Sequence, residues 1–403
     1  MIDARVTRDR LLNAGHFLDH MFMLVYTTAV ITIAAEQAWS YGELIALATP
    51  GFVLFGALSL PFGWAGDRFG RHRLMVAFFV GIGLAAVATG LADDRWQLAL
   101  GLSLIGIFAA IYHPVGIPML VQGLDRPGRV IGLNGVFGNL GVAAAPLLTG
   151  ALIAALGWRA AFVVPGLVSI ALGAVFWLAV PRDRPLARRR TERRSRFAEF
   201  RPGWVGVLAV IGVVTLGGGI IFNTTTVVLP KLFEERPIIE AGAGVLGYTV
   251  QASLVYAAAS MAQIVSGRAV DRLSAKWMLG GLIGAQAVAM ALLSVAEGPA
   301  AFAVSLVLML AVFGQIPIVD TIVTRYVPDH YRGRVFSLKY LINLTIGASA
   351  VPMIALFHSS WGGFEAMFLA LGAAALVMSV AALALPRQPA DLAAMTDAPG
   401  RAA

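Results

Sequence analysis

The stretch GWAGDRFGRHR at residues 63–73 returns in shortened form as GRAVDR at residues 267–272, about 204 positions further on. Both copies directly follow a long apolar segment. Further matches keep the same order and a similar offset: Gly128-Arg129-Val130 with Gly333-Arg334-Val335, Pro146 with Pro352, and the segment that begins at Trp158 with the segment that begins at Phe364. Such an internal repeat predicts that the chain folds as two like halves.

The composition indicates a membrane protein. Of the 403 residues, 59% are hydrophobic and 13% are charged, whereas soluble domains have roughly 45–50% and about 25%. A membrane-spanning helix needs about 20 apolar residues. Twelve apolar segments have about this length, namely 11–35, 44–66, 74–92, 96–123, 130–154, 159–180, 203–230, 242–266, 276–296, 299–326, 334–357 and 364–385. This pattern excludes a soluble enzyme and a disordered chain, and the absence of cysteine excludes a disulfide-stabilised secreted domain. The sequence predicts an all-α integral membrane protein with twelve transmembrane helices.

An arginine-rich stretch divides the chain into two blocks of six apolar segments. We expect an N-terminal six-helix bundle at 1–180, a basic linker at 181–202, a C-terminal six-helix bundle at 203–386 and a tail at 387–403. If the N-terminus is cytoplasmic, 26 of the 30 Lys and Arg residues lie in cytoplasmic segments. This positive-inside distribution predicts that both termini are cytoplasmic. The same distribution explains the net charge of +8, so no nucleic-acid partner is expected. Arginine outnumbers lysine 27 to 3, which favours the cytoplasmic (inner) membrane of a bacterium.

Residues 63–73 resemble the signature between the second and third helices of the major facilitator superfamily, and the copy at 267–272 lies where that family repeats it. Together with the repeat and the twelve apolar segments, the resemblance covers essentially the whole chain. It implies two pseudo-symmetric six-helix halves. Three stretches are similar to exporters of the fosmidomycin-resistance type: GHFLDHM at 15–21, YHP at 112–114, and FGNLG at 137–141 followed by Pro146.

The repeated motif predicts a gate on the cytoplasmic side. A carboxylate at the end of a span can accept hydrogen bonds from the N-termini of neighbouring helices, where the helix dipole favours negative charge. Basic side chains beside it can pair with acids such as Asp125. The alternative is that these charges only anchor the topology. The gate candidates are Asp67, Arg68, Arg71, Arg129, Asp271, Arg272 and Arg334.

Ionisable side chains inside the apolar segments indicate a functional cavity, because each costs roughly 2.5–3.5 kcal/mol in a membrane-spanning helix. The candidates for proton coupling or for the substrate cavity are His16, Asp19, His20, Met23, His113, Asn139, Asn223, Gln251, Gln315, Asp320 and Lys339. Asp19 is the first candidate for proton coupling. The alternative for the first segment is a buried, hydrogen-bonded cluster that stiffens the helix. Asp320 and Lys339 either form a buried ion pair, or Lys339 extends toward the membrane surface.

Prolines 114 and 118 predict a break in the fourth segment, because proline removes a backbone hydrogen bond. In the fifth segment, Gly138, Gly141, Pro146 and Gly150 resemble an antiporter motif. We favour close helix packing as the role of these small residues.

The sequence contains neither a phosphate-binding loop nor a His-Glu-x-x-His motif or a nucleophile elbow, so neither an ATP-driven motor nor an enzyme is expected. We predict a secondary active transporter that moves a small-molecule substrate by alternating access and is coupled to protons. The resemblance favours export. It would work as a monomer in the lipid bilayer, without a cofactor other than an ion gradient.

Two alternatives stay open at this point. One is an importer of a metal ion or a small metabolite, with His16, His20, Met21, Met23, His113 and Met119 as metal-ligand candidates. Against it, the first and fourth segments share no tight ligand spacing. The other alternative is a receptor that transports nothing.

Overall fold

The computed structural model is helical throughout the residues it describes, which are 4–124, 128–182, 200–238, 244–361 and 363–387. Within them, eleven helices are long and apolar enough to cross a membrane, or twelve if one bent pair of helices counts as one span. The prediction of an all-α protein with twelve spans is therefore confirmed. In chain order the helices are α1 (Ala4–Gln37), α2 (Tyr41–Ala46), α3 (Thr49–Ala57), α4 (Ser59–Phe69), α5 (Arg71–Gly90), α6 (Arg95–Ala109), the π-helical turn η1 (Tyr112–Gly116), α7 (Ile117–Val121), α8 (Gly128–Leu156), α9 (Ala160–Ala179), α10 (Trp204–Glu235), α11 (Gly244–Ala269), α12 (Ala275–Leu293), α13 (Gly298–Tyr326), α14 (Asp329–Gly347), α15 (Ala350–Trp361) and α16 (Glu365–Ala382).

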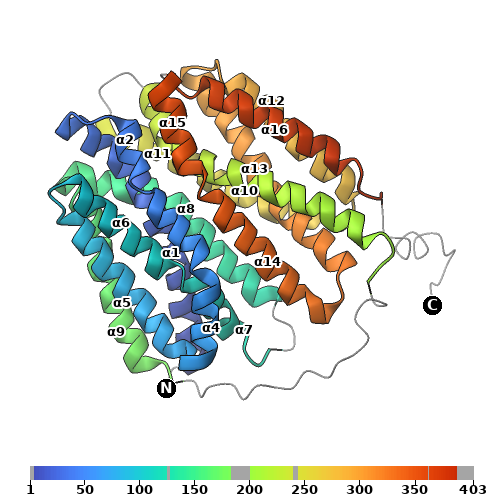
Figure 1. The fold of residues 1–403 in the computed structure, drawn as a ribbon, viewed down its shortest axis with the longest axis horizontal. Coiled ribbons are helices and arrows are strands. Elements are labelled where there is room, and N and C mark those ends of the chain that lie inside the picture. The colour runs from blue at the N-terminus through green and yellow to red at the C-terminus, as the bar shows by residue number, and fades with distance from the viewer. Residues whose placement is uncertain (1–3, 125–127, 183–199, 239–243, 362, 388–403) are drawn as a thin grey trace.

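The helices pack in the same pattern in the two halves (Figure 1). In the first half α1 packs on α8 and α5 on α9, and in the second half α10 packs on α14 and α12 on α16. The halves meet where α8 contacts α11 and where α2 and α3 contact α15 and α14. This arrangement follows the sequence repeat. The boundaries at 181–202 and 387–403 stay predictions, because residues 183–199 and 388–403 lie outside the described residues.

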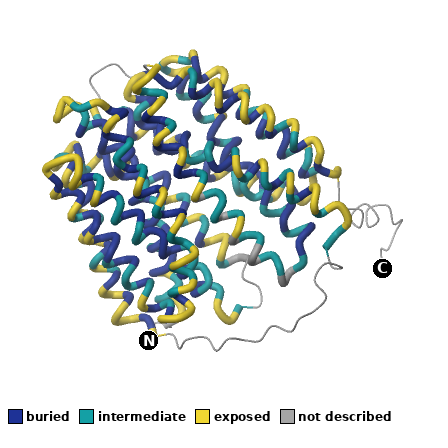
Figure 2. Tube along the Cα trace, in the orientation of Figure 1, coloured by how far each residue is buried: buried dark blue, intermediate teal, exposed yellow. Residues whose placement is uncertain are grey.

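Exposed residues lie along the outward faces of the bundle (Figure 2). Many of them are large and apolar: Leu178 is 83% exposed, Val377 65% and Leu84 56%. In water such a surface would be unfavourable, whereas lipid tails are as apolar as leucine. Polar and ionisable side chains are instead directed toward the interior, where Asp19 and Thr28 are 0% exposed.

Three predicted spans are interrupted. The segment expected at 44–66 consists of α2, α3 and α4, with a bend of 48° between α3 and α4. Pro50 lies in the first turn of α3 and Pro61 in the first turn of α4, where a missing backbone N–H is tolerated. The predicted break at Pro114 is confirmed by the π-helical turn η1. The eleventh span begins earlier than expected, at Asp329, and is divided between α14 and α15.

Candidate functional site

A cavity of about 270 Å³ lies at the centre of the molecule and is lined by both halves. Its walls come from α1, α3, α7 and α8 on one side and from α10, α11, α13 and α14 on the other. Apolar side chains, such as Phe52, Phe55 and Phe222, and polar side chains contribute to the lining in equal number. The predicted cavity residues that line it are His16, His20, Met23, His113, Asn139, Asn223, Gln315 and Lys339.

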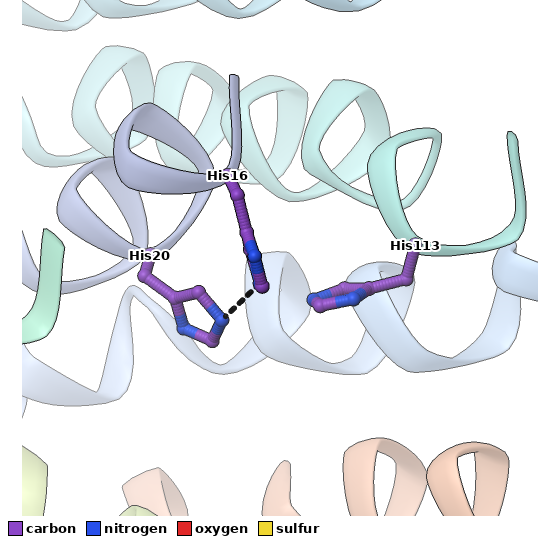
Figure 3. A group of neighbouring side chains, drawn as sticks. All are labelled: His16, His20 and His113. Carbon is purple, nitrogen blue, oxygen red and sulfur yellow. Dashed lines mark hydrogen bonds between the residues drawn. The ribbon is translucent and has the colours of Figure 1, made fainter. Parts of the chain in front are cut away.

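Three histidines form one wall of the cavity (Figure 3). His16 and His20 project from the same face of α1, and His113 reaches toward them from η1. The ring centroid of His16 lies 4.9 Å from that of His20 and 5.2 Å from that of His113. His16 Nε2 and His20 Nε2 are 3.1 Å apart. The i, i+4 spacing in α1 brings the first two rings together, and the break at Pro114 gives His113 its position.

Asp19 lies behind His113 rather than on the cavity wall. Its side chain is 0% exposed, and its Oδ2 is 3.3 Å from His113 Nε2. A buried carboxylate needs either a proton or a positive partner, because burial removes its hydration. His113 therefore stands between Asp19 and the cavity.

Asn134 of α8 organises this wall, although the sequence did not indicate it. Its backbone carbonyl accepts a hydrogen bond of 2.7 Å from His16 Nδ1. Its side-chain Nδ2 donates to Asn13 Oδ1 and to the Tyr112 hydroxyl, both at 2.9 Å. These contacts connect α1, η1 and α8 in one network. An asparagine within an apolar span was the available signal, since such a group needs buried partners.

Close approach of α8 to α1 depends on two glycines. A Cβ added at Gly138 would lie 2.7 Å from the His16 ring, and one at Gly141 would lie 2.2 Å from the Phe17 carbonyl oxygen. Neither position accepts a side chain without displacement of α1. The contacts support close packing as the role of these glycines.

An ion pair from the second half forms part of the opposite wall. Lys339 Nζ in α14 donates a hydrogen bond to Asp320 Oδ1 in α13. The Lys339 side chain is 12% exposed and that of Asp320 30% exposed. Of the two alternatives for Lys339, the structure thus shows the ion pair. Lys339 itself lines the cavity, and Asp320 lies behind it.

Neutral polar groups complete the lining. Gln286 Nε2 donates to Gln315 Oε1 at 3.1 Å, and Asn223 Nδ2 donates to the Gly219 carbonyl at 2.9 Å. Gln263 Nε2 of α11 and Asn139 Oδ1 of α8 lie 3.5 Å apart, across the boundary between the halves. Gln251 lies outside the cavity lining and donates to the Gly247 carbonyl within α11. This placement corrects the expectation that Gln251 belongs to the cavity.

The gate candidates whose side chains the structure describes lie away from the cavity lining. Arg71 Nη2 donates to Asp67 Oδ1 at 3.0 Å within the first half, and the Arg68 guanidinium lies 5.9 Å from the Trp64 ring centroid. Asp271 lies in the turn that follows α11. Arg272 lies in the same turn. The side chains of Arg129 and Arg334 lie outside the described part of the chain. The role of these residues as a cytoplasmic gate stays a prediction.

The two halves are in contact where α2 and α15 meet, on the side of the molecule opposite to α4 and α7 (Figure 1), and we call this the closed side. A Cβ at Gly42 of α2 would lie 2.0 Å from Ser359 Oγ of α15. His358 Nε2 of α15 is 2.9 Å from Glu235 Oε1 of α10, and its ring packs edge-on against Tyr41. Toward the other side, the lining extends to Ile131 in the first turn of α8, which is 43% exposed.

Two like helical halves around one central cavity with ionisable walls define a secondary transporter rather than an enzyme. The chain belongs to the Major Facilitator Superfamily, whose sequence profile matches residues 12–338 and 225–400. Among solved structures, it is similar to a bacterial homolog of the human lysosomal transporter Spinster in an inward-facing and occupied conformation. The TM-score is 0.74, with 17% sequence identity over 96% of this chain and 95% of that one. This likeness concerns the fold.

Two curated relatives carry names of drug-resistance proteins. The chain is 32% identical to the Multidrug resistance protein B homolog of Mycobacterium tuberculosis (strain CDC 1551 / Oshkosh) over 174 residues, which are 42% of this chain and 32% of that protein. It is 33% identical to the Puromycin resistance protein pur8 of Streptomyces alboniger over 188 residues, which are 40% of this chain and 36% of that protein. The chain thus spans about a third of the length of these relatives. The similarity to exporters of the fosmidomycin-resistance type stays a prediction.

Proposed function

We propose that this transporter exports a small amphipathic or drug-like solute in exchange for protons. The observation that carries the proposal is the central cavity, because both halves line it with apolar and polar side chains and with Lys339 of the ion pair. Such a cavity suits a ligand with an apolar body and one charged or polar end. The names of the two drug-resistance relatives support export as the direction.

The ion pair of Asp320 and Lys339 supplies a physical basis for antiport. Protonation of Asp320 removes the charge that holds Lys339. A cationic solute in the cavity can take the place of Lys339 beside the ionised carboxylate. The proton and the solute then compete for one carboxylate, and mutually exclusive occupancy is the condition for exchange.

Asp320 is better placed for this exchange than Asp19, the first candidate in the sequence. Asp320 is 30% exposed and its partner Lys339 lines the cavity, whereas Asp19 is 0% exposed behind His113. We therefore assign the exchange to Asp320 and use Asp19→Asn as a comparison. The two variants tell which half of the molecule carries the coupling.

For the cellular setting, we propose the inner membrane of a bacterium, with both termini in the cytoplasm and the chain acting as a monomer. The distribution of the basic residues supports this orientation, since 26 of 30 lie in the segments that would face the cytoplasm. In this orientation the closed side, where α2 and α15 meet, faces the outside. The charges of Asp67, Arg71 and Asp271 would then lie at the cytoplasmic surface, where a gate would close after the solute has left.

The test is proton flux in proteoliposomes that contain a pH-sensitive dye, with puromycin and tetraphenylphosphonium as probes. An imposed gradient of a transported probe should drive protons in the opposite direction. Asp320→Asn should remove at least nine-tenths of the proton flux. The matched control is Asp93→Asn, because the Asp93 side chain is 81% exposed and pairs with Arg159 at the closed end of the molecule. The control should transport like the parent.

Other results would point to other functions. Probe uptake without proton movement would contradict exchange and indicate facilitated transport. Proton flux that survives in Asp320→Asn and disappears in Asp19→Asn would move the coupling to the first half. Uptake of a metal ion or a metabolite along its own inward gradient, with no response to the two probes, would favour an importer. The three histidines support this alternative. A receptor would move no solute at all.

A further inference from the structure

The three histidines of the cavity wall have a geometry that the proposed exchange leaves unexplained. One ring nitrogen from each of His16, His20 and His113 can be chosen so that all three atoms lie within 4.8 Å of one another. His16 is buried, and the other two are partly buried and line the cavity. Imidazole nitrogens that lie this close together can bind one metal ion in common.

The spacing fits a metal ion. Around a tetrahedral zinc ion with Zn–N bonds of about 2.0–2.1 Å, neighbouring ligand nitrogens are about 3.3 Å apart. His16 Nε2 and His20 Nε2 are 3.1 Å apart in this structure. The nitrogen of the third ring lies within 4.8 Å of the other two and has to move closer to reach the same centre. This result corrects the expectation that the first and fourth spans share no tight ligand spacing.

Two of the three rings have the orienting partners that metal-binding histidines usually have. The Asn134 carbonyl can only accept, so His16 Nδ1 carries the hydrogen of their 2.7 Å bond. In the neutral ring, Nε2 then has its lone pair directed toward His20. His113 Nε2 faces Asp19 Oδ2 at 3.3 Å, which leaves Nδ1 of the same ring for a metal ion.

Asp19 supports a positive charge at this place. Its side chain is 0% exposed, and within the described part of the chain its carboxylate pairs with His113 Nε2 at 3.3 Å without a hydrogen bond of good geometry. A divalent ion on the far nitrogen of His113 would make that ring a stronger donor to Asp19 and would balance the buried charge. The combination of carboxylate, histidine and metal recurs in zinc proteins.

We propose that His16, His20 and His113 bind one divalent transition-metal ion of the zinc class. Imidazole is a favourable ligand for Zn²⁺, Co²⁺, Ni²⁺ and Cu²⁺. Asp19 and the Asn134 carbonyl orient two of the rings. Since the three histidines line the cavity, the fourth coordination position faces it and takes a water or an oxygen donor of a bound solute. All three ligands belong to the first half, so the site does not depend on the proposed exchange at Asp320.

The test is a Co²⁺ titration of the purified full chain in detergent, without a histidine tag and after treatment with a chelator. Visible absorption reports nitrogen ligation of Co²⁺, and competition with Zn²⁺ measures the affinity for zinc. We expect one ion per chain. His20→Gln and His113→Gln should each weaken binding at least tenfold, and Asp19→Asn should weaken it about tenfold because it removes an orienting group.

His358→Gln is the matched control, because His358 lies on the closed side of the molecule, where it pairs with Glu235. It should bind Co²⁺ like the parent. A Zn²⁺-dependent rise of the thermal unfolding midpoint in the parent and in His358→Gln, absent in His20→Gln, gives a second measurement that does not require an altered spectrum. Each variant is first checked for elution as a single species on size exclusion.

Two results would overturn the proposal. One is a parent protein that shows neither a Co²⁺ spectrum nor a Zn²⁺-dependent stabilisation at millimolar metal. The other is binding that persists in His20→Gln and His113→Gln, which would place the ion elsewhere. Because binding is measured without a gradient, a protein that binds metal but moves no protons would contradict only the exchange. A protein that exchanges protons but binds no metal would contradict only this site.

Discussion

At the scale of single residues, Gly138 decides how closely α8 approaches the histidine wall. Replacement by alanine places a Cβ 2.7 Å from the His16 ring. Because overpacking typically costs about 1–3 kcal/mol, we expect Gly138→Ala to lower the thermal unfolding midpoint and to weaken Co²⁺ binding at least fivefold. Thermal unfolding and the Co²⁺ titration measure the two effects.

Gly132 in the same helix provides the control for this substitution. Nothing outside the helix lies within 4 Å of a Cβ at this position. Gly132→Ala should therefore keep the parent's metal affinity and should gain up to about 1 kcal/mol from helix propensity. Equal behaviour of the two variants would show that the contact between Gly138 and His16 does not constrain the wall.

The residue-level site was predictable only in part. His16, His20 and His113 were cavity candidates because they are ionisable side chains inside apolar segments. Asp19 was expected on the cavity side, but the structure places it behind His113. The hydrogen bond from His16 to the Asn134 carbonyl could not be foreseen, because it depends on how the glycines of α8 seat that helix against α1. Such contacts between distant segments leave no local signal in the sequence.

At the scale of the helices, the ion pair of Asp320 and Lys339 holds α13 and α14 together next to the cavity. Removal of one partner leaves an uncompensated charge, whereas removal of both leaves none. Lys339→Met should therefore lower the thermal unfolding midpoint more than the double variant Asp320→Asn/Lys339→Met. For residues in contact, a coupling energy of about 0.5–3 kcal/mol is typical. Thermal unfolding in detergent of the parent, the two single variants and the double variant measures this coupling energy. Additive effects of the two substitutions would contradict a structural role of the ion pair.

The helix boundaries show that a proline in the sequence does not by itself predict a helix break. Pro50 and Pro61 begin new helices and interrupt the second span, which was expected to be continuous. Pro146 and Pro230 instead lie inside uninterrupted helices, and α10 continues to Glu235 beyond its expected end at 230. Neighbouring helices can satisfy the freed backbone groups in a bundle. The same residue type therefore interrupts one span and leaves another continuous, and the outcome depends on tertiary packing.

Arg159 and Arg236, two of the four basic residues predicted outside the cytoplasm, lie at helix C-termini. Arg159 Nη1 donates to the carbonyls of Gly90 and Ala92 at the end of α5. Arg236 Nη1 donates in the same way to Leu293 and Ala296 at the end of α12. A positive charge is favourable at a helix C-terminus, where carbonyls lack partners and the dipole is negative. These arginines cap equivalent helices in the two halves.

At the scale of the whole molecule, the repeat predicted the architecture but not which ionisable side chains each half presents to the cavity. Corresponding helices pack alike in the two halves, as the spacing of the repeated motifs indicated. The ionisable groups differ, since the first half presents three histidines to the cavity and the second presents Lys339, paired with Asp320. The two copies of the repeat share a backbone fold, whereas the side chains at corresponding positions differ between them. Sequence repeats therefore predict where a cavity lies better than what it binds.

Alternating access requires α2 and α15 to separate when the cavity opens on their side. A Cβ at Gly42 would lie 3.3 Å from the Ser359 Cβ, close to the about 3.5–4.5 Å of a disulfide. The chain has no cysteine, so Gly42→Cys and Ser359→Cys together introduce the only thiols. Oxidation of this double variant should abolish probe exchange in proteoliposomes, and a reductant should restore it. Either single variant should be insensitive to oxidant, because it has no second thiol with which to form the bond. Full exchange by completely cross-linked protein would show that α2 and α15 stay together throughout transport, and would contradict opening of the cavity at this contact.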